Sequence, residues 1–107
     1  MINPDDYPRP KFAEWRLVEK CTDELDALRL CIQLSNLSHE AIGEYLGIDK
    51  GHLCRTLQGR AHFPTAKRMS LMALCGNLAP LQYEAMRAGM ELVDSDVLAA
   101  VRSRRVA

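Results

Sequence analysis

The residues best able to do chemistry are the basic side chains of the segment 50–68. Most of the 14 acidic residues lie before Lys50, and none lies between Asp49 and Glu84. The basic residues of that interval are Lys50, Arg55, Arg60, Lys67 and Arg68, with His52 and His62 beside them. A formal net charge of zero therefore conceals a stretch that suits a polyanion such as nucleic acid. The same charges would equally suit a solvated surface that acids elsewhere balance.

Catalytic and metal chemistry find little support in the sequence. The four cysteines form neither a C-x-x-C pair nor a short cluster with histidine, and they are Cys21, Cys31, Cys54 and Cys75. Such cysteines are expected to be reduced structural thiols rather than metal ligands. No glycine-rich phosphate loop, H-E-x-x-H or G-x-S-x-G motif is present, so the sequence predicts no enzyme and no cofactor.

The elements that position the basic side chains are expected to belong to one all-α domain. The chain has 107 residues, of which 48% are hydrophobic and only 6% aromatic, and this favours helices over sheet. We expect a compact bundle of about five to seven short helices. Residues 1–22 would form an N-terminal arm with a short helix, 23–88 the core and 89–107 a helical tail. With no signal peptide and no apolar run of roughly 20 residues, the chain is expected in the cytoplasm, without membrane contact.

Apolar spacing and capping residues predict helices on both sides of the central segment. Thr22 is the expected N-cap of a helix over 23–35, and Thr65 is the expected N-cap of one over 66–75. Pro80 suits the first position of a further helix, with Leu81 to Ala88 following, and a last helix starts at about Ser95. A first helix over 11–20 is expected to bury Phe12, Trp15, Leu17 and Val18.

Two short helices separated by a tight turn are predicted in the segment 38–59. Ser38 is a good N-cap, and Gly47 suits the left-handed conformation that ends a helix. The pattern then repeats at once, because Asp49 is a second N-cap and Gly59 a second end. The three residues between the two helices leave space only for a sharp turn.

The segment 37–59, LSHEAIGEYLGIDKGHLCRTLQG, resembles the helix-turn-helix of phage Cro and repressor proteins and of their bacterial relatives. The resemblance covers about 23–88 and implies the lambda-repressor-like DNA-binding fold. Gly43 supplies the small residue needed where the helices cross, and Gly47 supplies the turn. The residues that would point inward are Ile42, Leu46, Ile48, Leu53 and Leu57. The sequence departs from the family at three positions. The family usually has alanine in place of Gly43 and an apolar residue in place of Thr56, and it often has glutamine in place of His39.

The resemblance implies roles for individual residues, because in this family the second helix enters the major groove. On the helix predicted over 50–58, base contacts would come from Lys50, Gly51, His52, Cys54 and Arg55. Arg55 is the strongest candidate, since a guanidinium can pair with guanine O6 and N7. Phosphate contacts would come from His39, Gln58, Arg60, His62, Lys67 and Arg68.

These roles predict a sequence-specific regulator of transcription, most simply a repressor, that binds double-stranded DNA in a bacterial or phage-infected cell. The alternative is a helix-turn-helix adaptor that acts through a protein partner, such as an antitoxin or a mobile-element inhibitor. A homodimer is expected, because pairing two units doubles the length of the site that is read. Its predicted seam is Met90, Val93, Val97, Leu98 and Val101, unless the tail folds back onto Phe12 and Trp15.

Overall fold

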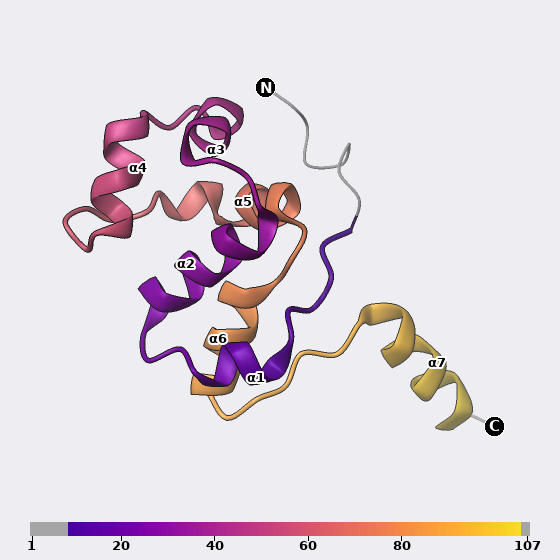
Figure 1. The fold of residues 1–107 in the computed structure, drawn as a ribbon. Helices are drawn as coiled ribbons and strands as arrows, with labels where there is room; N and C mark the ends of the chain where they lie inside the picture. The colour runs from indigo at the N-terminus through magenta and orange to yellow at the C-terminus, as the bar shows by residue number, and fades with distance from the viewer. Residues whose placement is uncertain (1–8, 106–107) are drawn as a thin grey trace.

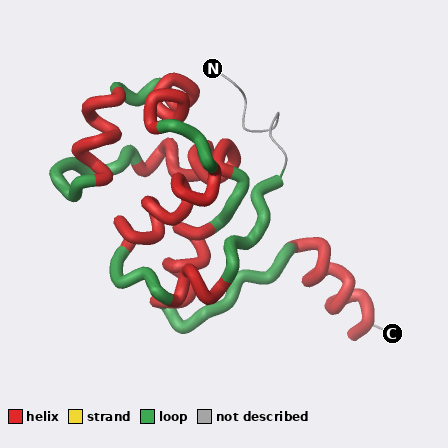
Figure 2. Tube along the Cα trace, in the orientation of Figure 1, coloured by secondary structure: helices red, strands yellow, loops and turns green. Residues whose placement is uncertain are grey.

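Helices form almost all of the regular structure in the computed structural model, which describes residues 9–105 (Figures 1 and 2). That range holds seven α-helices, one short 3-10 helix and no strand, so the predicted all-α bundle is confirmed. The elements are α1 Trp15–Glu19, α2 Glu24–Ser35, α3 His39–Leu46, α4 Lys50–Leu57, η2 Thr65–Lys67, α5 Arg68–Cys75, α6 Ala79–Arg87 and α7 Ser95–Arg105. The first part of the predicted N-terminal arm, 1–8, lies outside the described residues. No helix in the described range is long and apolar enough to cross a membrane.

The core forms around α2, which packs against α5 and α6 and also touches α1 and α4. Its buried residues fall at helical spacing on one face and are Ala27, Leu28, Cys31 and Ile32. Leu71 and Met72 of α5 and Tyr83 of α6 complete the centre of this core. The helices α3 and α4 lie together at one end of the bundle (Figure 1). The buried side chains of Ile42 and Leu53 pack these two helices against the bundle.

The chain before α1 is extended, and the prediction of a helix from residue 11 was wrong there. Lys11 forms an isolated parallel β-bridge with Asn77. The buried Gln82 side chain accepts a hydrogen bond from the Ala13 N–H at 2.7 Å and donates one to the Ala13 carbonyl at 3.0 Å. These bonds hold 11–13 in an extended conformation, so α1 starts only at Trp15. Phe12, predicted to be buried, is 43% exposed.

The helix boundaries agree with the predicted caps in the centre of the chain and differ at two other places. Ser38 and Asp49 cap α3 and α4 as expected, since each side chain accepts a backbone N–H. The cap of α2 is Asp23 rather than Thr22, whose hydroxyl and N–H instead donate to Asp26. Thr65 caps nothing, because the chain enters α5 through the 3-10 turn η2.

The helix α7 follows Gly89 and a short irregular segment and extends away from the bundle (Figure 1). Its start at Ser95 confirms the predicted last helix. The helix does not pack on α1, so the predicted alternative of a tail folded onto Phe12 and Trp15 is not what the described structure contains. Those two aromatic rings instead contact each other, with centroids 6.2 Å apart.

Candidate nucleic-acid interface

The turn between α3 and α4 is built by the close approach of two backbone segments. The Ile48 N–H donates to the Gly43 carbonyl at 2.8 Å. A Cβ placed on Gly43 would lie only 2.6 Å from the Ile48 carbonyl oxygen, a backbone atom that has no freedom to move aside. Gly47 between them has a φ of +68°, which a glycine adopts without steric cost. The glycine at position 43 is thus required by this turn.

Apolar side chains and one hydroxyl fix α4 against the bundle. Ile42, Leu46, Ile48 and Leu53 are buried as predicted, and Leu57 is half-buried. Thr56 on the same inner side of α4 is 2% exposed. Its hydroxyl donates to the His52 carbonyl at 2.9 Å, so the buried polar atom has a partner and does not destabilise the site.

Two cations from outside the hairpin bind the C-terminal ends of its helices. The Lys67 ammonium donates to the Leu46 carbonyl at the end of α3 and to the Gly47 carbonyl at 3.4 Å. The Arg29 guanidinium of α2 donates through Nε and Nη2 to the Leu57 carbonyl at the end of α4, at 2.8 and 2.6 Å. Cations stabilise these ends because unpaired carbonyls and the helix dipole make them negative. The pair fixes the orientation of α3 and α4 on the bundle.

Arg29 was missed in the sequence analysis, although one signal could have identified it. It is the only basic residue of α2, in a stretch otherwise rich in acids. Lys67 was assigned to a phosphate, but the structure places its ammonium beneath the turn, on the α3 carbonyls. Both residues therefore act in this structure by positioning α3 and α4.

The side of α4 that faces away from the bundle gathers the predicted base-contacting residues. Lys50 and Arg55 are exposed there, while Gly51, His52 and Cys54 are half-buried. The Arg55 side chain runs back along the helix toward Gly51. Its Nη1 lies 3.2 Å from the position that a Cβ on Gly51 would take. Lys50 lies 3.9 Å from the Glu40 carboxylate in a solvated pair of little strength. A guanidinium and an ammonium near one helix N-terminus can together bind anionic and acceptor groups.

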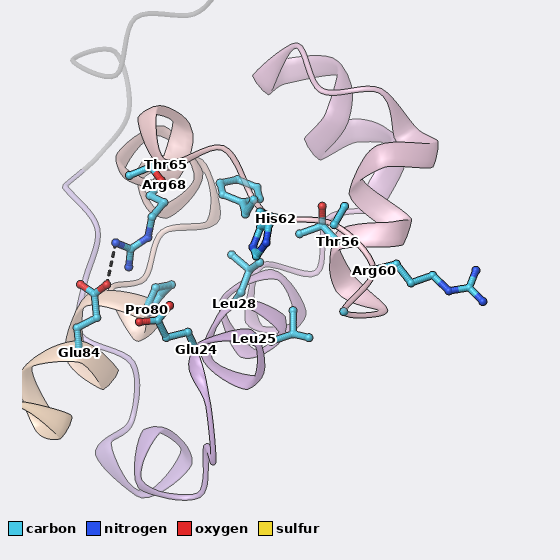
Figure 3. A pocket seen from close by; sticks show the side chains of 13 residues that line it. Glu24, Leu25, Leu28, Thr56, Arg60, His62, Thr65, Arg68, Pro80 and Glu84 are labelled. Atoms are coloured by element: carbon cyan, nitrogen blue, oxygen red, sulfur yellow. Dashed lines mark ion pairs between the residues drawn. The ribbon is translucent and has the colours of Figure 1, made fainter.

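The predicted phosphate-binding residues are spread over several sides of the hairpin. Arg60 points into solvent from the loop after α4 (Figure 3). His62 is exposed in the same loop, and its carbonyl lies 3.3 Å from His52 Nε2. Gln58 is exposed as the C-cap of α4. Gln58 and Arg60 thus offer polar groups beside α4, whereas the His62 side chain points into a pocket that Leu28 also lines (Figure 3).

Arg68 and His39 lie apart from that group. Arg68 forms an ion pair with Glu84 of α6 at 2.9 Å (Figure 3). That pair borders a cavity of about 670 Å³ between α2, the loop after α4 and α6. His39 is exposed at the start of α3 and borders a groove that Arg29 and Leu57 also line. The structure thus directs Arg68 toward the bundle and places His39 at the start of α3, beside that groove.

The cysteines do not form a reactive or metal-binding group in the described residues. Cys31 and Cys75 are buried together, and the hydrogen bond with Cys75 and then burial raise the pKa of the Cys31 thiol. Cys21 and Cys54 are half-buried and unpaired with another thiol. In 9–105 no three His, Cys, Asp or Glu side chains are grouped as a metal site would need.

Comparisons of the chain with protein-family models, with curated proteins and with solved structures found no match.

Proposed function

We propose that this chain is a sequence-specific regulator that binds double-stranded DNA through α4 and represses transcription by occupying its operator. The observation that carries the proposal is the arrangement of α3 and α4, a capped hairpin whose outer helix exposes Lys50 and Arg55. The likeness of segment 37–59 to the Cro and repressor helix-turn-helix supports the same interpretation. A helix so held can enter the major groove with its N-terminal half foremost.

The residues divide into three groups in this proposal. Arg55 pairs with a guanine, and Lys50, Gly51, His52 and Cys54 adjoin neighbouring base edges. Gln58, Arg60, His62 and His39 bind phosphates beside the groove. Lys67 holds the hairpin through the α3 carbonyls and Arg68 pairs with Glu84 of α6, so neither residue is assigned a direct phosphate contact in this proposal.

Selection of bound duplexes from a random pool, followed by titration of the selected duplex, tests the proposal. Arg55→Ala is expected to weaken binding to the selected site by about 1–3 kcal/mol and to relax the preference at one base pair. Arg87→Ala is the matched control, since Arg87 is exposed at the end of α6, and α6 lies away from α4 in the bundle (Figure 1). Failure to bind any duplex at low salt and micromolar protein would overturn the proposal.

The adaptor function is the second candidate, and one observation favours it. Of the five cations from Lys50 to Arg68, Lys67 and Arg68 are bound to protein groups and Lys50 lies 3.9 Å from the Glu40 carboxylate, which leaves few free charges for DNA. Combining Lys50→Ala with Arg55→Ala separates the two functions. If the double variant loses both DNA binding and the effect of the protein on the cell that expresses it, the result supports the regulator. If that effect survives after DNA binding is lost, the result supports a protein partner.

We further propose that the active form is a homodimer, because one α4 reaches few base pairs. Two copies related by a two-fold axis would read two half-sites one helical turn apart. A palindromic sequence among the selected duplexes is the result expected from such a dimer.

A further inference from the structure

The helix α7 is attached to the rest of the molecule almost only through the chain itself. Among the described residues it shares no packed interface with another helix (Figure 1). Its ion pair with the rest of the described chain is Arg9–Asp96 at 3.0 Å, whose side chains are 73% and 81% exposed. An ion pair so solvated contributes at most about 1 kcal/mol. The bundle therefore does not hold α7 in place.

An unpacked helix of this length needs another surface to be stable. With 11 residues, α7 is shorter than the roughly 12–15 residues at which isolated helices become marginal in water. Val97 and Val101 lie one turn apart, 56% and 41% exposed. Leu98 beside them is half-buried. These three residues form an apolar stripe that the described residues leave largely uncovered.

The charges at the two ends of this stripe indicate what would cover it. Val97, Val101 and Arg104 follow one another at intervals of four and three residues and share one side of α7, and Asp94, which directly precedes the helix, stands three residues ahead of Val97. The apolar pair is thus flanked by an acid at one end and a base at the other. The charged pair, Asp94 and Arg104, and the apolar pair, Val97 and Val101, are both symmetric about position 99 in the sequence. A helix with this pattern is complementary to itself when the second copy runs in the opposite direction.

We infer that α7 is a self-association surface that pairs antiparallel with α7 of a second copy. A two-fold axis that passes between the two helices at the level of residue 99, on the side opposite the Ala99 side chain, places Val97 against the second copy's Val101, and Asp94 against its Arg104. A parallel pair would instead bring like charges together at both ends. Two such short helices bury less than the roughly 1,600 Å² of a standard interface. The pairing is therefore reversible, and it does not depend on DNA binding.

Sedimentation equilibrium of the full chain without DNA tests the pairing. Over a range from about 1 to about 500 µM the chain is expected to pass from monomer to dimer. Val101→Asp removes half of the apolar contact, and we expect it to weaken the dimer at least about ten-fold. Arg102→Glu is the matched control, because Arg102 lies on the other side of α7 and its change should leave the dimer intact. A chain that stays monomeric throughout, or a dimer that Val101→Asp leaves unchanged, overturns the inference.

The antiparallel direction has its own test in two charge variants. Asp94→Lys and Arg104→Glu each place like charges together and are expected to weaken the dimer several-fold. An equimolar mixture of the two variants restores it. In the mixed dimer the introduced lysine of one copy faces the introduced glutamate of the other, and the unchanged Arg104 faces the unchanged Asp94. If mixing restores nothing, the antiparallel pairing is wrong.

Two controls separate this charge effect from a loss of folding. Asp94→Asn controls for the cap, because the Asp94 carboxylate also accepts the Asp96 N–H at 2.8 Å. Its dimer should be weakened less than that of Asp94→Lys, since asparagine caps a helix without introducing a like charge. Thermal melting of each variant should match the parent chain, as α7 does not pack on the core.

Discussion

Arg29 and Leu57 are joined by two hydrogen bonds to one oxygen, since Nε and Nη2 of the guanidinium both donate to the Leu57 carbonyl. This contact ties the end of α4 to the middle of α2, 28 residues earlier in the chain. The helix proposed to read DNA is therefore oriented by a residue on a different helix.

Arg29→Ala is expected to lower the free energy of unfolding by about 1 kcal/mol. This value lies toward the low end for a hydrogen bond made by a charged group, because Arg29 is partly exposed to solvent. Urea denaturation measures the loss. Arg16→Ala on α1 is the control, since no hydrogen bond or ion pair of Arg16 is found in the described residues, and it should be nearly neutral. Equal effects of the two substitutions would contradict an orienting role for Arg29.

Gly43→Ala is expected to destabilise the chain by about 1–3 kcal/mol, because the added Cβ would overlap the Ile48 carbonyl oxygen. Gly51→Ala is the comparison, since its Cβ would meet only the ends of the Asp49 and Arg55 side chains. It also gains up to about 1 kcal/mol of helix propensity. Denaturant melts should therefore give a much lower free energy of unfolding for Gly43→Ala than for Gly51→Ala. The reverse order would show that the turn can open to accept alanine.

Lys67→Ala and Arg60→Ala should affect DNA binding in different ways if the proposed function holds. Arg60 is free in solvent, so its loss should reduce the slope of log affinity against log salt by about one. Lys67 binds the α3 carbonyls, so its loss should lower stability and leave the salt slope unchanged. Titrations at several salt concentrations, paired with urea melts, distinguish the two. A reduced slope for Lys67→Ala would return that residue to the phosphate contacts.

Asp26 should make stability depend on acid. The Thr22 hydroxyl and N–H, with a smaller effect of Arg29, hold the pKa of Asp26 below its ordinary value. A carboxyl with a lowered folded-state pKa stabilises the fold above its unfolded-state pKa, and the contribution is lost as the pH falls through the folded-state pKa. Asp26→Asn should therefore be less stable than the parent near about pH 6, and the gap should shrink toward about pH 3. Urea melts at both pH values measure the gap, and a constant gap would contradict the assignment.

The sequence predicted α3 and α4 well because local chemistry determines them. Ser38, Gly47 and Asp49 act within one turn of their own position, so their types alone place the helix ends. The partners of Arg29 and Lys67 could not be found in this way. A long flexible cation reaches many carbonyls, and tertiary packing decides which one it binds.

The same reason explains the failure at the N-terminal end. Residues 11–20 have a helical pattern, but Ala13 is bound by an amide side chain 69 residues away. No local signal marks Gln82 as that partner. Thr22 fails as a cap for a smaller reason, since Asp23 next to it competes for the same role and Asp26 takes the threonine hydroxyl.

The bond between Ala13 and Gln82 also has a consequence for the order of folding. It closes the chain into a loop that contains every helix from α1 to α5, and the loss of chain entropy on closing so long a loop is large compared with that of any single turn. Gln82 is positioned only once α6 has formed and packed on α2, so we expect the extended segment 11–13 to dock after the helices have assembled. The N-terminal segment would then join the bundle last. The Ala13 N–H should become protected from hydrogen exchange only when the whole bundle has formed.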